Sequence, residues 1–512
     1  MTHRRITALV LLSLAVVAAG AFAAIGSGSA SAGAEERAKG ASAVPADALA
    51  YASVNLDRDG APFRSLEALA AKVDGGEAAV ARLNDMLDGR SGQAEMIRAL
   101  GGDVSVGLLG IDPTPVAAGG QPAAEAVVVA TAADGPALAG ALRKAGFDQG
   151  PAIAGRDVWE QGAMAVAIQG STAIAGTSRA SLADAIGAQT GAKPALADDP
   201  AFTATIAKLP GDAVAVAYIA PARLAGIIRA AGPLLPKGGA AKDAPDMAAS
   251  LARLAQDLQG VRGLGIAVTA EAGGLRVIAA GDADQAALQR LGARFPTAYA
   301  PAILAQVPAD AVGVAAFRDL GPTLLAGVTA MERRDPQARS LIASIEKTTG
   351  IGVAELAGAL GGEHAVYATA GATPGAALIT RPQDPAAAAA VLGRVVTAAR
   401  DLAAMAPKQG EGARRPLPPV AVTRDGGTVA VGSLRSAAAT PSASIADSAA
   451  FRAIADRAGL PGEVTGVAYI DGAALRAAAR ARGVSLPAGS GAIGGALAWG
   501  TATGGVLYIP IG

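Results

Sequence analysis

No cysteine occurs among the 512 residues of this sequence. Its absence excludes disulfide bonds, thiol nucleophiles, thiolate metal sites and a lipid-modified N-terminal cysteine. Histidine is nearly as scarce, because His3 and His364 are the two copies and His3 precedes the first apolar segment. One histidine therefore remains for chemistry in the body of the chain, and no second one there can complete a metal site or support it in catalysis.

Neither sign of charge is in excess. Lys plus Arg and Asp plus Glu number 43 each, so the net charge is zero. A protein without a basic excess is a poor candidate for nucleic-acid binding. The sequence also has no Walker-type loop and no strand-linked G-x-G-x-x-G motif, which argues against nucleotide binding. We therefore expect no nucleic-acid partner, no nucleotide and no cofactor.

Aromatic residues are rare in an otherwise apolar chain. They make up 3% of the residues, whereas hydrophobic residues as a whole make up 52%. The core must therefore be built from small aliphatic side chains and closely packed elements. The length is too great for one ordinary core and favours two domains.

The chain begins with an apolar run that carries no charge. Arg4 and Arg5 precede this run, which extends from Ile6 to Ile25. At ~1.5 Å per residue it spans ~30 Å, the thickness of a bilayer core, which favours an uncleaved anchor. Ala-x-Ala cleavage sites at 21–23 and 30–32 leave signal cleavage open. We expect a single-pass cell-membrane protein with its bulk outside the cytoplasm or, after cleavage, a secreted one.

Five segments of the first half recur in the same order in the second half. The matches are VPADALAY (44–51) with VPADAVGV (307–314), RALGGDVSV (98–106) with GALGGEHAV (358–366), GSTAIAGTSRAS (170–181) with GGTVAVGSLRSA (426–437), 199–224 with 447–475, and 263–281 with 494–512. Five ordered matches predict a tandem duplication with a period on the order of 250 residues, which is a domain-sized unit.

Strand signals mostly recur in adjacent pairs with helical segments between the pairs. This order predicts an α+β fold of two tandem, internally duplicated modules after an N-terminal membrane or signal helix. Each module is expected to be a largely antiparallel sheet backed by helices. The expected division is 1–32 as signal peptide or signal anchor, 33–43 as flexible linker, 44–295 as the first module and 296–512 as the second.

Turn and capping signals place the elements of the first half. We predict strands at 48–56, 104–110, 126–132, on both sides of Gly170 and at 214–219, helices at 66–87, 93–100, 136–146, 180–190, 202–208, 222–231 and 247–258, and a hairpin around Gly273-Gly274. Thr177 or Ser178 is the expected cap of the helix at 180–190. The charge-free tail, 483–512, is interpreted as a buried hairpin because glycine pairs interrupt it.

His364 follows Gly-Gly-Glu at the start of a predicted strand, where the first copy has Val104. A histidine that acts as a base or ligand needs a triad or metal partners. We interpret His364 as a strand-end residue that is partly solvated or satisfied by its neighbours.

The segment from Asn55 to Gly60 resembles a calcium loop, because oxygen-bearing residues alternate before a glycine. The loop needs a glutamate where Leu66 stands, and Glu67 is one residue late. We interpret the segment as a polar turn that enters a helix, and we assign no metal ligands.

Ser344 and Lys347 match the S-x-x-K pattern of serine acylases. Thr348-Thr349-Gly350 follows at once and is typical of a helix end, where a lysine suits the helix dipole. No K-T-G motif follows, so we treat the match as chance.

Carboxylates occupy equivalent turns in both copies. The pairs are Asp47 and Asp310, Asp103 and Glu363, and Asp212 and Glu463. Paired carboxylates can perform acid–base chemistry, but each of these lies just before a strand, where turns favour acidic residues. We assign no catalytic residue.

Three stretches resemble an uncharacterised, mainly actinobacterial family that is catalogued as a domain of unknown function. They are PADALAYASVNLD, ALGGDVSVGL and DPAFTATIAKLPGDAVAVAYI. The resemblance implies an exported or single-pass membrane-anchored protein with the shared fold of that family. It implies no catalytic residues.

The first functional hypothesis is a non-catalytic extracytoplasmic envelope protein that binds or scaffolds a partner. The second is a carrier of an apolar envelope ligand such as a lipid, which requires an apolar cavity of at least several hundred Å³. The third is a hydrolase that uses serine and carboxylates, with Ser344 as its best candidate. The expected partners are an envelope protein or a lipid, and the membrane through the N-terminal helix.

Overall fold

The structure is a computed structural model of the chain. It describes residues 40–55, 57, 60–73, 75–78, 81, 100–112, 123–231, 252, 255–256, 258–284, 297–334, 336–370, 374–405, 420–433, 437–485, 490–501 and 504–512. Their contacts divide the chain into two compact units. Unit 1 comprises Met1–Ala287, Thr503–Val506 and Ile511, and unit 2 comprises Leu288–Ala502, Leu507–Pro510 and Gly512.

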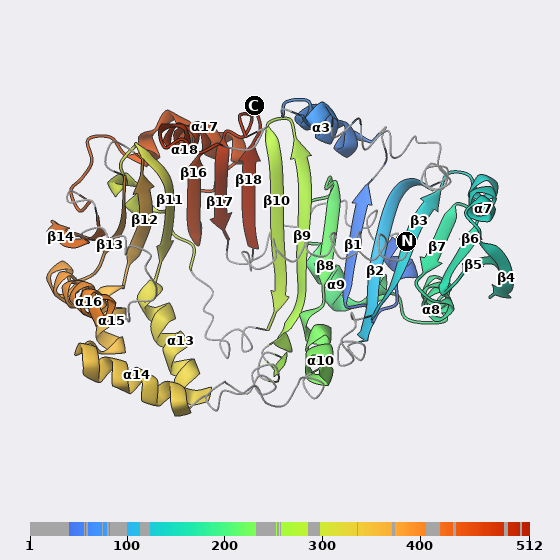
Figure 1. Cartoon of the computed structure of the whole chain (residues 1–512), viewed down its shortest axis with the longest axis horizontal. Coiled ribbons are helices and arrows are strands. Elements are labelled where there is room, and N and C mark those ends of the chain that lie inside the picture. The colour runs from blue at the N-terminus through green and yellow to red at the C-terminus, as the bar shows by residue number, and fades with distance from the viewer. Residues whose placement is uncertain are drawn as a thin grey trace. The chain divides into compact units, whose positions relative to one another are not determined.

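Unit 1 is organised around antiparallel strand pairs in the order β10-β9-β8-β1-β2-β3-β7-β6-β5-β4 (Figure 1). The strands are β1 (Ala50–Asn55), β2 (Leu100–Asp112), β3 (Ala123–Ala132), β4 (Asp148–Ile153), β5 (Arg156–Gln161), β6 (Met164–Gln169), β7 (Thr172–Gly176), β8 (Ala215–Ile219), β9 (Val261–Glu271) and β10 (Gly274–Ala283). The helices are η1 (Gly40–Ala43), α3 (Ala61–Ala70), α7 (Gly135–Lys144), α8 (Arg179–Gln189), η2 (Leu196–Asp198), α9 (Pro200–Ile206) and α10 (Pro221–Ala231).

The main core of unit 1 contains three aromatic rings among small aliphatic side chains. Phe202 lies edge-to-face against Tyr51 at 5.4 Å and against Tyr218 at 5.1 Å between ring centroids. Burial raises the pKa of Tyr218 to about 12. The rest of this cluster is Ala, Val, Ile and Leu. Trp159 packs in a second cluster of the same unit, under α7.

Glycines in β9 allow α9 to lie directly on the sheet. A Cβ atom at Gly265 would meet Thr205 Cγ2 at 2.8 Å and Leu209 Cδ1 at 3.1 Å. A Cβ atom at Gly263 would meet Thr205 Oγ1 at 2.3 Å. The low aromatic content thus goes together with close helix–sheet contact, as the composition predicts.

The Pro-Ala-Asp turn of unit 1 is hydrogen-bonded to the segment around η2. The Val44 carbonyl accepts a hydrogen bond from the Leu196 amide at 2.7 Å, and the Ala46 amide donates to Pro194 at 3.0 Å. Just before the turn, residues 40–43 form η1 with Ala41 and Ala43 buried, although we predicted a linker up to residue 43.

Unit 2 pairs its strands antiparallel in the order β17-β16-β11-β12-β13-β15-β14. The strands are β11 (Ala311–Arg318), β12 (Glu363–Thr369), β13 (Gly375–Arg381), β14 (Ala421–Asp425), β15 (Thr428–Gly432), β16 (Gly466–Asp471) and β17 (Gly495–Gly500), followed by β18 (Gly504–Pro510). The helices are η4 (Ala302–Gln306), α13 (Leu320–Arg334), α14 (Pro336–Thr349), α15 (Val353–Ala359), α16 (Pro385–Met405), η5 (Ile445–Asp447), α17 (Ala449–Ala458) and α18 (Gly472–Ala481).

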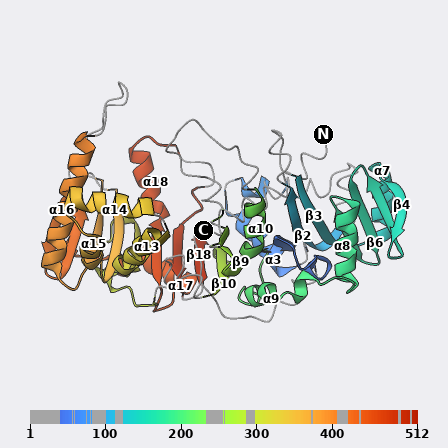
Figure 2. The same ribbon diagram turned by 90° about the horizontal axis from the view of Figure 1, so that it is seen from below.

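Four helices of unit 2 form a group against one face of its sheet. Figure 2 shows α13, α14, α15 and α16 side by side. Leu360, Val391 and Leu392 pack there with Val429 of β15. α16 contacts β14 and β15 directly, α14 and α15 contact α16, and α13 contacts α14 and α15.

The opposite face of the unit 2 sheet is covered by η4, η5 and α17. Phe451 of α17 lies edge-to-face on Tyr469 of β16, with ring centroids 5.2 Å apart. The Val307 carbonyl accepts from the Ile445 amide at 2.8 Å, which bonds the second Pro-Ala-Asp turn to η5. Trp499 of β17 is buried in this unit.

The predicted mixed α+β class with antiparallel strands is confirmed. Ser178 caps α8 through its side chain, as predicted. The helix predicted at 66–87 is wrong in its start and its continuity, because α3 runs from Ala61 to Ala70 and the backbone turns at Gly75, where φ is +80°, before residues 76–78 are helical again. The β4–β5 hairpin was not predicted.

The predicted membrane or signal segment, 1–32, lies outside the described residues. Within the part of the chain that the structure describes, no helix is both long enough and apolar enough to span a bilayer.

Candidate functional site

His364 lies in β12 and is fully buried. Its ring stacks on Phe317 of β11 at 5.6 Å between centroids. Among the described residues, neither ring nitrogen has a partner in hydrogen-bonding geometry. Desolvation lowers the pKa of His364, and the backbone of Leu360 and the charge of Asp319 oppose this shift less strongly. The prediction of a partly solvated or satisfied histidine is therefore wrong, because the α15 end and Phe317 enclose the ring.

The segment from Asn55 forms the polar turn that we predicted. The Asn55 side-chain oxygen accepts a hydrogen bond from the Asp57 amide at 2.8 Å, and the Asp57 carbonyl accepts from the Gly60 amide at 3.0 Å. Gly60 then precedes α3. Within the described residues, no group of three or more His, Asp or Glu side chains is placed to hold a metal ion.

Ser344 and Lys347 are both exposed on α14. α14 ends at Thr349, as the helix-end interpretation predicts. No hydrogen bond joins the two side chains in the described structure, so the geometry does not place a base on the Ser344 hydroxyl.

The recurring carboxylates are turn and strand-edge residues. Asp47, Asp310, Asp212 and Glu463 are exposed in turns. The Glu363 carboxylate accepts a hydrogen bond from the Ile303 amide at 2.8 Å. Asp103 lies opposite Asn55 in the β1–β2 register.

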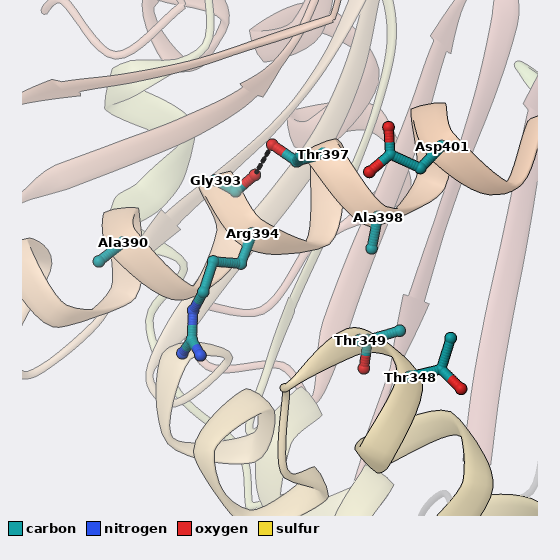
Figure 3. Close-up of a pocket in the computed structure, with 8 residues that line it drawn as sticks. All are labelled: Thr348, Thr349, Ala390, Gly393, Arg394, Thr397, Ala398 and Asp401. Carbon is teal, nitrogen blue, oxygen red and sulfur yellow. Dashed lines mark hydrogen bonds between the residues drawn. The ribbon is translucent and has the colours of Figure 1, made fainter. Parts of the chain in front are cut away.

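A cleft of about 540 Å³ lies in unit 2 between the end of α14 and the middle of α16 (Figure 3). Its lining is Thr348, Thr349, Ala390, Gly393, Arg394, Thr397, Ala398 and Asp401. Small residues of α16 form one wall because the helix repeats every 3.6 residues, which brings residues spaced by three or four to one side. This volume lies within the range of ligand pockets.

Polar contacts fix the geometry of the cleft. Arg394 of α16 donates to the Gly350 carbonyl at 2.9 Å and forms an ion pair with Glu355 of α15. Glu346 of α14 accepts from the Val353 amide at 2.8 Å. The end of α14 is therefore tied to both neighbouring helices. The Arg394 charge is already paired.

Two threonine hydroxyls of the cleft are bonded to their own helices. Thr397 donates to the Gly393 carbonyl at 3.0 Å, the bond drawn in Figure 3, and Thr349 donates to the Ile345 carbonyl at 2.8 Å. No described group is placed to activate these hydroxyls. The cleft can therefore bind a ligand, to which the Asp401 carboxylate offers a hydrogen-bond acceptor and a negative charge.

Apolar side chains lead along α14 toward the cleft. Leu341 is 62% exposed and Ile345 is 52% exposed, whereas Ile342 of the same helix is buried. Leu341, Ile345 and Thr348 lie on one side of α14 by their spacing of four and three residues. The exposed apolar side therefore continues into the cleft.

A family model matches residues 148–415 of the sequence and is described as Protein of unknown function (DUF3352). The chain belongs to this family. The match confirms the predicted resemblance to a family of unknown function, and it contains every residue that lines the cleft. The DUF3352 match begins at β4 of unit 1 and ends after α16 of unit 2.

Solved structures add little to the DUF3352 assignment. Crystal forms IV, I and III of TP0453 are similar to this chain with a TM-score of 0.25 and identities of 9%, 10% and 10%. They cover 47%, 48% and 48% of this chain, and 79%, 79% and 80% of TP0453. A TM-score at this level does not assign a shared fold. No curated protein matches the sequence.

The cleft was not predicted from the sequence. Its α16 wall lies in the alanine-rich run that begins at Ala386, and this run contains no motif that predicts a binding or catalytic site. The available signal was the exposed apolar pair Leu341 and Ile345 in a helix whose remaining surface is polar.

Proposed function

We propose that this chain is a non-catalytic binding protein of the cell envelope, and that the α14–α16 cleft receives an amphipathic helix of a partner protein. The observation that carries this proposal is the exposed apolar side of α14, which continues into the cleft. Apolar side chains at this exposure are commonly partner contacts when they adjoin a concave site.

The dimensions favour a helical segment as the occupant. Leu341 and Thr348 are seven residues apart, which is roughly 10 Å along α14 at ~1.5 Å per residue. This length matches two turns of a partner helix that presents apolar residues at positions i, i+3 or i+4, and i+7. Asp401 lies at the far end of the lining and favours a basic residue at the corresponding end of the partner.

The place of action is part of the proposal. The charge-free run from Ile6 to Ile25 after Arg4 and Arg5 supports a membrane anchor with the bulk outside the cytoplasm. Secretion after cleavage at 30–32 is the alternative. In both cases the cleft lies outside the cytoplasm.

The test is to fill the cleft without disturbing the fold. A Cβ atom at Gly393 would meet no atom within 4 Å, so Gly393→Leu places a side chain in the open cleft. Photo-crosslinking from position 345 in the producing cells identifies the partner segment, and a synthetic peptide of that segment is then titrated in fluorescence anisotropy. We expect an amphipathic helical peptide whose affinity falls at least about tenfold in Gly393→Leu and in Leu341→Asp.

Two variants serve as matched controls. Gly226→Leu adds the same side chain at another helical glycine with open space, and Leu475→Asp adds the same charge at an exposed leucine of α18. Both should bind like the wild type. Equal losses in the controls, or unchanged binding in Gly393→Leu, would contradict the proposal.

A lipid is the second candidate occupant, because the cleft volume of about 540 Å³ is large enough for part of an acyl chain. Native mass spectrometry of the purified protein checks this. If the wild type retains lipid and Gly393→Leu does not, the occupant of the cleft is a lipid and not a helix of a partner protein.

We also propose that the two units arose by tandem duplication. Their turns make the same backbone bond: Leu196 donates to Val44 at 2.7 Å in unit 1, and Ile445 donates to Val307 at 2.8 Å in unit 2. β1 pairs with β2 and β8, and β11 pairs with β12 and β16.

The aromatic pairs support the same origin. The rings of Phe202 and Tyr218 are 5.1 Å apart at 82°, and those of Phe451 and Tyr469 are 5.2 Å apart at 89°. A crystal structure checks the proposal by superposing β1, β2, β8 and α9 on β11, β12, β16 and α17. A different strand register in the two sets would rule it out.

A further inference from the structure

Three charged side chains lie side by side at one end of the unit 2 sheet. Arg318 of β11 is opposite Glu363 of β12, and Glu363 is opposite Arg381 of β13. Opposite residues in adjacent antiparallel strands point to the same face, and strands are ~4.8 Å apart. The two arginines therefore flank the glutamate on one face of the sheet.

The two arginines of this end differ in how they are paired. Glu363 accepts a hydrogen bond from the Ile303 amide at 2.8 Å. Arg318 forms a long ion pair with Asp319, with 3.9 Å between Nε and Oδ1, and its guanidinium lies 5.8 Å from the Tyr299 ring centroid. Arg381 has no hydrogen bond or ion pair to any residue that the structure describes. The planar guanidinium of arginine holds five N–H donors in a fixed arrangement that matches the oxygen atoms of a carboxylate or phosphate.

The backbone beside these residues is held in an uncommon conformation. Asp319 has φ of +58°, and its amide donates to the Gly362 carbonyl at 3.0 Å. Gly362 has φ of +89°, and a Cβ atom there would meet the Arg381 carbonyl at 2.2 Å. Non-glycine residues at positive φ are concentrated at functional sites, where the surrounding structure maintains the strain.

These residues enclose a pocket of about 310 Å³, lined by Arg318, Asp319, Gly362, Glu363, Arg381, Pro382 and Gln383. We infer that this pocket is a binding site for an oxyanion, a carboxylate or a phosphate group, held by Arg381 and Arg318. Guanidinium groups bind such anions through two parallel N–H···O bonds. The Gln383 amide is an additional donor in the lining.

The first repeat provides an internal comparison. At the end of β1 it places Asn55 opposite Asp103, where β11 and β12 place Arg318 opposite Glu363. The arginine is therefore not needed to build this strand end. This site is separate from the α14–α16 cleft, and the inference goes beyond the proposed function.

The test uses the full chain and inorganic phosphate. Calorimetric titration at constant ionic strength should show saturable binding to the wild type, and affinity should fall at least about tenfold in Arg381→Gln and in Arg318→Gln. Acetate in a parallel titration shows whether a carboxylate is preferred. Vesicles of phosphatidylglycerol compared with phosphatidylcholine show whether the phosphate is free or carried by a lipid.

Arg457→Gln removes an exposed arginine of α17 and is the control that should bind like the wild type. Arg381→Lys keeps the charge but loses the planar fork, so it should bind more weakly than the wild type and more tightly than Arg381→Gln. The absence of saturable binding of both phosphate and acetate by the wild type overturns the inference. Equal affinities in Arg381→Gln and Arg457→Gln also overturn it. Neither result affects the peptide-binding test of Gly393→Leu, so the two sites are tested independently.

Discussion

At the scale of single residues, some buried polar side chains are hydrogen-bonded to one another and others are not. In unit 1 the Tyr51 hydroxyl and the Ser105 hydroxyl are 2.9 Å apart, and Ser105 donates to Ser53 at 3.2 Å. In unit 2 the side chains of His364 and its cross-strand neighbour Thr380 are buried and have no hydrogen-bond partner in the part of the chain that the structure describes. The first arrangement stabilises the fold, and the second makes it sensitive to protonation.

The buried His364 should make stability depend on pH. Its pKa is lowered in the folded protein by desolvation, so below about pH 6.5 the unfolded chain binds a proton that the folded chain does not. Stability is therefore complete above that pH and decreases as the pH falls toward the folded pKa. Urea unfolding at pH 7 and pH 5 should show a larger loss for the wild type than for His364→Phe. Equal losses would contradict the prediction.

The Tyr51 network gives a second prediction at this scale. Tyr51→Phe leaves the Ser105 hydroxyl with fewer partners in a buried site and should lower the free energy of unfolding by about 1–2 kcal/mol. Tyr218→Phe is the matched control, because within the described residues the Tyr218 hydroxyl makes one long hydrogen bond, 3.4 Å to the Arg262 carbonyl. Its cost should be smaller in the same denaturant titration. The reverse order would show that the Tyr51–Ser105 bond contributes little.

At the scale of elements, the small residues decide how closely a helix can lie on a sheet. α9 rests on Gly263 and Gly265 of β9, and no side chain on those residues separates the two elements. The N-terminal cap of α9 is Asp199, whose side chain accepts from the Phe202 amide at 2.8 Å. The cap fixes where the helix begins, and the glycines fix how near it lies.

Two alanine substitutions should therefore have opposite signs. Gly265→Ala puts a methyl group 2.8 Å from Thr205 and should cost about 1–3 kcal/mol. Gly226→Ala in α10 meets no atom within 4 Å and should stabilise by about 0.5–1 kcal/mol, because alanine favours helices. Thermal unfolding of the two variants checks this. A loss of stability in Gly226→Ala would contradict it.

Local signals predicted many elements of unit 1. The predictions were correct for Ser178, one of the two expected caps, for the turn into β8 and for the hairpin at Gly273. Each of these features depends on a few adjacent residues. The end of α3 at Ala70 was missed because the apolar spacing continues beyond it. The candidate site could not be predicted, because the α14–α16 cleft depends on helix packing between residues far apart in the sequence.

At the scale of the whole molecule, the chain is built from two units of the same class, each with its own core. A VPAD turn precedes a central strand in each unit, β1 in unit 1 and β11 in unit 2. The Arg318–Arg381 pocket occurs in the second unit.

The N-terminal apolar run should anchor the protein in the membrane. The run from Ile6 to Ile25 is long enough to span a bilayer core, so we expect the intact protein in the membrane fraction of the producing cells. Intact-mass measurement on the purified protein checks this. A mass that corresponds to a chain starting after Ala32 would show cleavage and secretion instead.

The scarcity of aromatic residues has a practical consequence. The chain has two tryptophans, and the structure buries Trp159 in unit 1 and Trp499 in unit 2. Each unit thus carries one intrinsic fluorophore in a shielded environment. Replacing either indole with phenylalanine leaves a spectroscopic signal that belongs to one unit alone, so the unfolding of each can be followed separately without any added label.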